Sequence, residues 1–178
     1  MKRSRKDRPE PSRKPRSLLQ QLALMPDKLF NGGFRLQYGA LCYRWIAADD
    51  FQVLLITSRG TGRWVIPKGW PMKKKKPHEA AEIEAWEEAG IRGRVRKKPV
   101  GRYTYLKWLD NSDVAPCVVE VFEIEVKDVV SEYKERGQRQ LAWVSPSEAA
   151  RRVREVELKS LLIDFKPKSS RYEAGSAE

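Results

Sequence analysis

A proline and a glycine bracket the stretch of this chain whose structure the sequence constrains most tightly. Pro77 stands where a helix can begin and Gly90 where a helix commonly ends. The residues between them, His78–Ala89, are rich in strong helix formers and include no glycine or proline. Small side chains recur there at every fourth position, at Ala81, Ala85 and Ala89. We therefore predict a helix over 78–89 with one face able to lie close against a sheet.

Strand patterns occupy much of the chain on both sides of this helix. Runs rich in β-branched and aromatic residues, separated by turn residues such as Asp49-Asp50, predict strands at 35–46, 52–57, 95–109, 115–126 and 140–144. The strands at 95–109 and 115–126 are predicted to form a long hairpin joined by residues 110–113. Two further helices are predicted over 147–153 and 157–165. In the last helix, four residues at helical spacing are predicted to be core: Leu158, Leu161, Leu162 and Phe165.

Composition disfavours several classes of protein. The 178 residues fit a single domain, and a formal charge of +12, from 36 Lys and Arg against 24 Asp and Glu, favours an anionic partner or substrate. His78 is the only histidine, which disfavours a serine or cysteine hydrolase with a histidine base. Cys42 and Cys117 lie far apart without CxxC spacing, so we expect buried thiols in a reducing compartment, with neither a thiolate zinc site nor a disulfide framework.

The two ends of the chain are predicted to lie outside the folded domain, 33–165. Residues 1–16 carry eight Lys and Arg and three prolines, which predicts a disordered basic tail. Its charge suits contact with nucleic acid, and a solvated leader is the alternative. Residues 17–32 are predicted as a short helix and linker, and 166–178 as a mobile tail. No apolar run approaches the roughly 20 residues that span a bilayer, so we expect a soluble, cytoplasmic protein without a membrane partner.

Acidic residues crowd the predicted helix. Five glutamates lie within ten residues, at Glu79, Glu82, Glu84, Glu87 and Glu88. Like charges at this density repel one another on a bare helix, and three of them, Glu84, Glu87 and Glu88, fall within an arc of about 100°. A divalent ion would neutralise them, and all-oxygen ligation selects Mg²⁺ or Mn²⁺ over zinc. An ordinary solvated acidic face is the alternative.

A basic loop, Trp64–Lys76, precedes the acidic helix. It presents lysines beside the predicted metal site, an arrangement that suits a substrate with several phosphates. Lys68, held between Pro67 and Gly69, is the best candidate for such a contact. The run Lys73–Lys76 is also explained, at least in part, as a solvated surface charge.

At these residues the sequence resembles the Nudix box, usually written GX5EX7REUXEEXGU with U a bulky apolar residue. The resemblance rests on Gly69 and on the run Glu84-Ala-Trp-Glu87-Glu88-Ala-Gly90-Ile91, whose spacing fits without a gap. Flanking segments at 38–44, 63–67 and 140–143 look most like the diphosphoinositol polyphosphate phosphohydrolase branch. The resemblance implies an α/β fold, the Nudix α/β/α sandwich with a mixed, partly antiparallel sheet.

The same resemblance implies a metal-dependent hydrolase of a diphosphate linked to another group, acting on a small anionic polyphosphate. It implies that Glu84, Glu87 and Glu88 are catalytic and hold the metal together with Gly69. The substrate-binding residues that it implies are Arg35, Thr57, Ser58, Arg59, Lys68 and Arg139, with ordinary surface arginines as the alternative for the basic ones. A further acid often assists in this family. Glu120, Glu123 or Glu125 on the later strand could serve, with Glu120 on one face of that strand and the other two on the opposite face, and we take Glu120 as the candidate.

Two positions depart from the box. Ile83 replaces its arginine, and Lys75 replaces its first glutamate. In the family the arginine helps to orient the acidic cluster, so the carboxylates here must be positioned by the metal or by another base. Two other functions stay open: hydrolysis of a dinucleoside polyphosphate, which Lys68 also suits, and a non-catalytic module that binds a nucleotide or RNA. The sequence names neither the exact substrate nor the oligomeric state.

Overall fold

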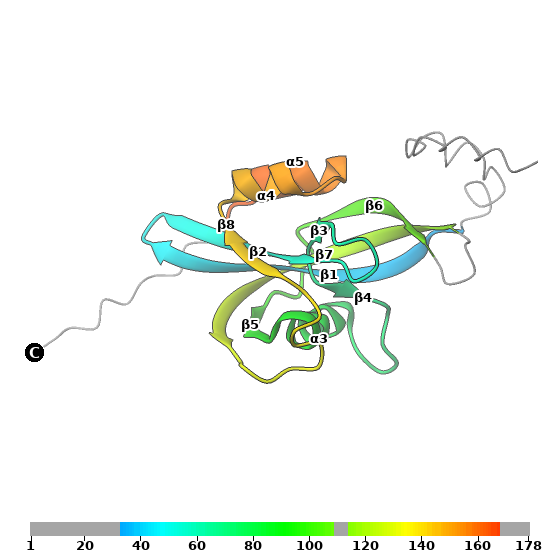
Figure 1. Ribbon diagram of the computed structural model, residues 1–178, viewed down its shortest axis with the longest axis horizontal. Coiled ribbons are helices and arrows are strands. Elements are labelled where there is room, and N and C mark those ends of the chain that lie inside the picture. The colour runs from blue at the N-terminus through cyan, green and yellow to red at the C-terminus, as the bar shows by residue number, and fades with distance from the viewer. Residues whose placement is uncertain (1–32, 109–113, 168–178) are drawn as a thin grey trace, which may run out of the picture. The chain divides into compact units, whose positions relative to one another are not determined.

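The computed structural model describes residues 33–108 and 114–167 (Figure 1). From Phe34 onward these residues belong to one compact unit. Its strands are β1 (Arg35–Ala47), β2 (Asp50–Thr57), β3 (Trp64–Val65), β4 (Lys68–Gly69), β5 (Ile91–Val95), β6 (Gly101–Trp108), β7 (Val114–Val129) and β8 (Leu141–Val144). Its helices are α3 (Pro77–Ala89), α4 (Pro146–Arg152) and α5 (Val156–Asp164). The predictions for residues 1–32, for 110–113 and for the tail beyond 167 lie outside the described residues.

The strands form one mixed sheet. β1 runs parallel to β7, from Arg35 opposite Cys117 to Tyr43 opposite Glu125, and antiparallel to β2. The order is β3-β2-β1-β7-β5, with β4 paired to β1, β6 to β7 and β8 to β2. Because the other described pairs are antiparallel, the prediction of a mixed, partly antiparallel sheet is confirmed.

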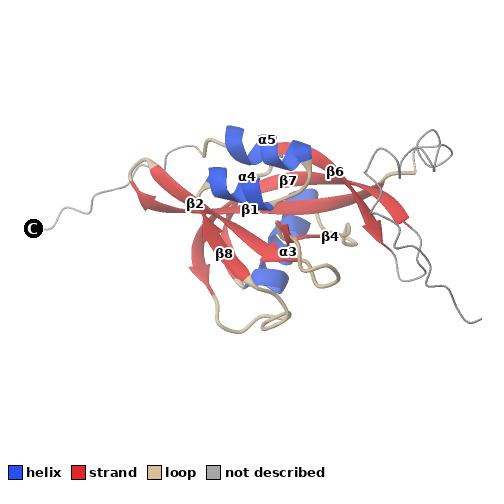
Figure 2. Cartoon of the chain, turned by 45° about the horizontal axis from the view of Figure 1, so that its top comes forward, coloured by secondary structure: helices blue, strands red, loops and turns tan. Residues whose placement is uncertain are grey.

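Helices cover both faces of this sheet. Figures 1 and 2 show α4 and α5 on one face and α3 on the other. The core beneath α3 contains the predicted alanine stripe, Ala81, Ala85 and Ala89. The core beneath α5 contains Leu158, Leu162 and Phe165, with Leu161 packed against it. The predicted α/β/α sandwich and the core residues of its last helix are therefore confirmed.

The segment predicted as one strand over 95–109 belongs to two strands. β5 ends at Val95 and β6 starts at Gly101, and both pair antiparallel with the long β7. Residues 96–100 connect them and stay bonded to β7 through the N–H groups of Arg96 (3.1 Å) and Val100 (2.8 Å). The prediction of a continuous strand is therefore wrong. Strand propensity does not reveal that two separate strands pair with different parts of the same long strand.

The other predicted helices are confirmed, with small shifts at their ends, and so is the state of the cysteines. α3, α4 and α5 each start one residue before the predicted position. Cys42 and Cys117 are buried and free, and burial raises the pKa of both thiols. Within the described part of the chain, no helix has the length and apolar character needed to cross a membrane.

Candidate active site

Both ends of α3 are held by local geometry. At its start the Glu79 carboxylate accepts a hydrogen bond from the Lys76 backbone N–H (2.9 Å), and a proline occupies the first turn. At its end Gly90 adopts a left-handed conformation with φ of 69°. A Cβ on Gly90 would lie 2.6 Å from Tyr133 Cδ1 and from the Val130 carbonyl oxygen. Gly90 is therefore required both for its backbone conformation and for the close approach of the chain that follows β7.

Glu84 lies directly against Gly69. A Cβ on Gly69 would stand 1.8 Å from Glu84 Oε1, so only glycine leaves room for this carboxylate. Among the described residues, none forms a hydrogen bond or ion pair with the carboxylate. Burial raises the pKa of Glu84 to about 7, and the charges of Glu88, Glu87 and Glu135 act in the same direction. Negative charge is thus concentrated around a carboxylate that is open to an added cation.

Glu88 is buried between two donors from different elements. The Lys68 backbone N–H on β4 donates to Oε2 (2.9 Å), and Arg139 Nη2, just before β8, donates to Oε1. Burial raises the pKa of Glu88, whereas the positive charges of Arg139 and Lys68 lower it. Glu88 therefore ties α3 to both β4 and the segment before β8.

Arg139 joins three parts of the site. Its Nε donates to Glu135 Oε2 (2.7 Å), its Nη1 donates to the Thr57 carbonyl oxygen (2.9 Å) and its Nη2 donates to Glu88. Only 7% of this side chain is exposed. The structure thus places a residue that was predicted to bind substrate against one of the helix carboxylates. Its contact with substrate stays a prediction.

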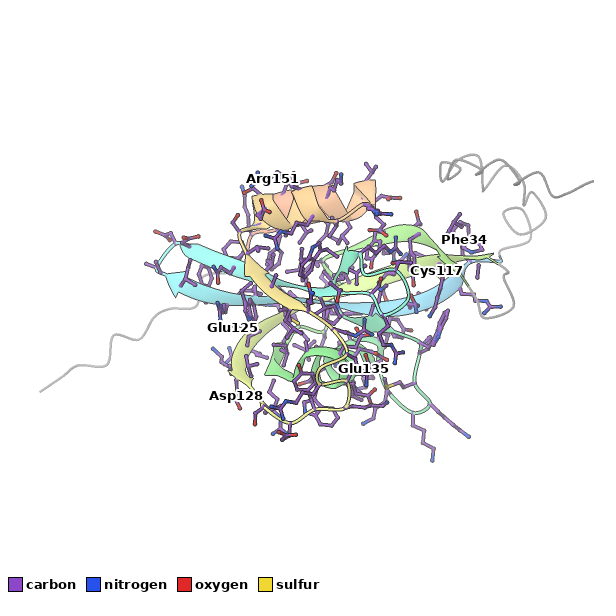
Figure 3. The ribbon with its side chains drawn as sticks, in the orientation of Figure 1. Phe34, Cys117, Glu125, Asp128, Glu135 and Arg151 are labelled. Carbon is purple, nitrogen blue, oxygen red and sulfur yellow. The ribbon has the colours of Figure 1, made fainter. Side chains whose placement is uncertain are left out.

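Sequence reasoning missed two charged residues beside α3. Lys134 Nζ lies 2.6 Å from Glu87 Oε2, and the Glu135 backbone N–H donates to the Glu87 carbonyl oxygen (2.9 Å). Figure 3 shows Glu135 beside α3. The run of charges at 132–136 is visible in the sequence, but it is typical of a solvated loop. Only the folded chain shows that this loop lies on the acidic helix.

A basic cluster lies at the side chain of Lys68. Lys68 Nζ and Arg63 Cζ are each 5.3 Å from the centre of the Tyr105 ring. Burial lowers the pKa of Lys68 to about 8, with Glu88 acting against the shift and Arg63 reinforcing it, so the ammonium is largely charged at neutral pH. Glu155, which is buried, pairs with Arg63 at 2.7 Å. Sequence reasoning gave Arg63 no role, although it lies in a segment that carries the resemblance.

Two more cations lie at the same end of the sheet. Arg35 on β1 lies opposite Cys117 on β7, and Lys107 on β6 lies opposite Ala115. Burial raises the pKa of the Cys117 thiol, and the positive charges of Lys107, Arg35 and Lys68 oppose that rise. Lys107 Nζ also lies 4.3 Å from the centre of the Trp70 ring, just after β4. The structure therefore brings together Arg35 and Lys68, which were both predicted to bind substrate, and adds Lys107.

The other predicted substrate residues lie on or beside the turn between β2 and β3. Thr57 meets Arg139 through its carbonyl oxygen, and Arg59 Nη1 lies 3.3 Å from Glu135 Oε1. The Ser58 hydroxyl is bonded within its own turn at 2.6 Å. The structure thus joins Thr57 and Arg59 to the network around Arg139. Their contacts with substrate stay predictions.

Glu120, the predicted further acid, is held by Arg102. The guanidinium donates from Nε (3.2 Å) and Nη2 (2.7 Å) to Glu120 Oε1. The role of Glu120 stays a prediction, but Glu135 is the acid outside the helix that the structure brings into electrostatic contact with Glu84. The run 73–76 is exposed throughout, as a solvated charge run would be.

A comparison with known proteins identifies the family. The family model described as NUDIX domain matches residues 36–164. The chain belongs to the Nudix family. It is a Nudix hydrolase of diphosphate-linked substrates, and residues 69–91, which resemble the Nudix box, lie within the matched part.

Similar Nudix proteins differ in how much of the chain they match. Nudix hydrolase 13, mitochondrial, from Arabidopsis thaliana is 28% identical over 152 residues, 76% of this chain and 75% of the relative. Human diphosphoinositol polyphosphate phosphohydrolase 3-alpha is 35% identical over 63 residues, 35% of this chain and 38% of that protein. The crystal structure of C. elegans Ap4A hydrolase has a TM-score of 0.53 at 19% identity, covering 73% of this chain and 94% of that chain. This structural likeness supports the fold alone, and the cytoplasmic location stays a prediction.

Nudix hydrolases typically use divalent metal ions, and the residues here suit such an ion. Carboxylates are the hard oxygen ligands that Mg²⁺ and Mn²⁺ prefer. Because Gly69 has no side chain, the Glu84 carboxylate can contact the backbone of β4. Within the described residues no three acidic side chains are grouped as ligands of one ion. Glu87 and Glu88 are each paired with a protein cation, but their oxygens keep further lone pairs. Their pairing with protein cations therefore leaves Glu87 and Glu88 able to accept an ion as well.

Proposed function

We propose that this Nudix hydrolase uses Mg²⁺, with Mn²⁺ as a substitute, to cleave the diphosphate of a small polyphosphorylated molecule of the diphosphoinositol polyphosphate type. The observation that carries the proposal is the position of Lys68. Its backbone N–H binds Glu88 of the acidic cluster, while its side chain lies beside Arg63 over the Tyr105 ring. β4 thus joins a group of residues suited to a divalent ion to a group suited to phosphate oxygens.

The number of cations supports a substrate with many phosphates. Arg63 and Lys68 meet at Tyr105, and Arg35 and Lys107 lie at the same end of the sheet. Glu155 already pairs with Arg63, so the charges of Arg35, Lys68 and Lys107 remain, and a single diphosphate, as in a nucleotide sugar, leaves part of that charge without an anionic partner. The partial match to the human diphosphoinositol polyphosphate phosphohydrolase is consistent with this choice. We therefore favour the more highly charged substrate.

The chain supplies distinct groups for the reaction. A bound divalent ion would make a water molecule more acidic and neutralise charge on the diphosphate. Glu84, Glu87 and Glu88 would hold the ion. The Glu84 carboxylate has no hydrogen bond or ion pair among the described residues, so it could meet the ion without breaking an existing pair. Lys68 and Arg63 would stabilise the charge that develops on the departing phosphate.

Hydrolysis of a dinucleoside polyphosphate is the second candidate, and Trp70 favours it. This side chain is 37% exposed and follows β4 directly, with Lys107 over its ring. An exposed indole beside phosphate-binding cations suits a stacked base. The non-catalytic alternative lacks comparable support, because the three glutamates on the helix part of the box, Glu84, Glu87 and Glu88, are present and the chain belongs to a family of hydrolases.

The proposal is tested by measuring how the purified 178-residue chain hydrolyses different substrates. We would measure KM at saturating Mg²⁺ for a diphosphoinositol polyphosphate, a dinucleoside polyphosphate and a nucleotide sugar, each at two salt concentrations. The diphosphoinositol polyphosphate should have the lowest KM, and salt should raise that KM by screening the outer cations. Lys68→Met should raise it further, whereas Lys127→Met, a change at an exposed pair on β7, should not. A preference for the nucleotide sugar at both salt concentrations would contradict the proposal.

A further inference from the structure

Glu87 has no basic neighbour on its own helix. The positions one turn away are occupied by Ile83, Glu84, Gly90 and Ile91. Residue 83 lies four positions before Glu87, the spacing from which a basic side chain reaches a glutamate along a helix. Because that position is an isoleucine, positive charge beside Glu87 must come from another element.

The segment 130–140, between β7 and β8, supplies that charge, and we name it the clamp segment. Two backbone hydrogen bonds anchor it, one from the Val130 N–H to the carbonyl of Gly90, the residue that caps α3 (2.8 Å), and one from the Glu135 N–H to the Glu87 carbonyl within α3 (2.9 Å). Lys134 directly precedes Glu135, and its Nζ lies 2.6 Å from Glu87 Oε2 although 62% of the side chain is exposed. The backbone bond at Glu135 therefore brings an otherwise solvated lysine to a box carboxylate.

The clamp segment holds a second box carboxylate as well. Arg139, at the other end of the clamp segment, donates a hydrogen bond to Glu88. Its Nε also forms an ion pair with Oε2 of Glu135, in the same segment, at 2.7 Å. Arg59 approaches Glu135 from the β2–β3 turn at 3.3 Å. The acids that face this region are Glu84, Glu87, Glu88 and Glu135, and the cations are Arg59, Lys68, Lys134 and Arg139.

We infer that Lys134 and Arg139 are positioning residues, which supply from outside the helix the charge that position 83 lacks. They hold Glu87 and Glu88 in the orientation that the proposed reaction needs, so the inference rests on the proposed function. Lys134 contacts only Oε2 of Glu87, which leaves Oε1 available to an ion. Arg139 commits Nε, Nη1 and Nη2 to protein oxygens, which assigns it to Glu88 in preference to substrate.

The exposed Lys134 gives the cleaner test, because an Arg139 variant would leave the buried Glu88 unpaired and endanger folding. The full chain is compared with Lys134→Met, Ile83→Arg and the double variant. Lys127→Met is the matched control, since Lys127 is 56% exposed and lies 2.7 Å from its own glutamate on β7. At saturating Mg²⁺, Lys134→Met should lower kcat about tenfold with KM nearly unchanged, because orientation is lost without loss of a substrate contact. Ile83→Arg should recover most of kcat in the double variant.

Binding of Mn²⁺, measured by the EPR signal of the free ion, separates positioning from simple charge compensation. The number of ions bound by Lys134→Met should equal that of the wild type, with affinity changed by less than about threefold, because every ligand remains. If Lys134→Met bound Mn²⁺ more tightly than the wild type and kept its kcat, Lys134 would only neutralise Glu87 where the ion otherwise does. That result would overturn the inference. So would failure of Ile83→Arg to restore kcat.

Thermal unfolding of the metal-free protein tests the pairing without any substrate. Lys134→Met should lower Tm by about 1–3 °C, Ile83→Arg should restore it, and both effects should disappear when Glu87→Gln is also present. A loss that persists in the Glu87→Gln background would show that Lys134 acts elsewhere. Failure of the wild type to hydrolyse any diphosphate would contradict the proposed function. The Tm values of these variants would still show whether Lys134 pairs with Glu87 and whether an arginine at position 83 can replace it.

Discussion

The replacement Gly69→Ala tests how closely β4 is fitted to α3. The new Cβ would lie 1.8 Å from Glu84 Oε1 and 2.0 Å from Cδ, and real Cβ contacts are essentially never shorter than 3.0 Å. The carboxylate must therefore move by about 1 Å or more, and a displacement of that size costs about 10²-fold in rate when the group is catalytic. Because a glutamate side chain can swing aside, the stability lost should stay within the usual range for overpacking, about 1–3 kcal/mol.

The assay for Gly69→Ala is kcat at saturating Mg²⁺, together with the unfolding temperature. Gly60→Ala is the matched control, because a Cβ on Gly60 would meet nothing within 4 Å, and its kcat should equal that of the wild type. We expect Gly69→Ala to remain folded and to lose about 10²-fold in kcat. A folded Gly69→Ala protein with kcat near the wild-type value would show that the reaction does not need Glu84 against β4, and would refute the reasoning.

Three further predictions concern charge. Glu155→Gln should lower the free energy of unfolding by up to about 3 kcal/mol in calorimetry, because it leaves the partly buried Arg63 without its carboxylate, and an unchanged Tm would contradict this. KM for the polyphosphate should rise as the pH passes about 8, where Lys68 loses its proton, and Lys68→Met should remove that rise. In the metal-free chain the folded pKa of Glu84, about 7, exceeds its ordinary value of 4.5. Its contribution to stability is therefore complete below about pH 4.5 and is lost as the pH rises through 7, so Glu84→Gln should flatten the fall in Tm over that range.

The acidic helix was predictable because its determinants are local in sequence. Pro77 and Gly90 mark the ends of α3, and the spacing of its glutamates follows directly from helix geometry. The need for glycine at position 69 was also visible as part of the box motif. What the motif does not contain is the reason, which is contact with the Glu84 carboxylate fifteen residues later.

The partners of the acidic helix were not predictable, because they are brought to it by tertiary structure. Lys134 and Glu135, beside the helix, and Arg63, beside Lys68, lie in loops whose charged residues are typical of solvated surface. They reach the site because β7 returns the chain to the end of α3 and because β3 follows β2 in the sheet. Tertiary structure also decides that residues 91–108 form two strands, β5 and β6, because both pair with the long strand β7. The sequence of 95–109 alone does not show this.

The short strand β4 explains how opposite charges can be held side by side in this site. It is fixed to β1 through Tyr38 opposite Gly69 and Gly39 opposite Lys68. From this rigid support Gly69 touches Glu84, the Lys68 N–H binds Glu88, and the Lys68 side chain lies over Tyr105. Two consecutive residues therefore set the separation between the acidic helix and the basic cluster. A substrate that must meet a metal ion and several cations at once depends on that separation, so backbone changes in β4 should affect catalysis more than the loss of any one surface lysine.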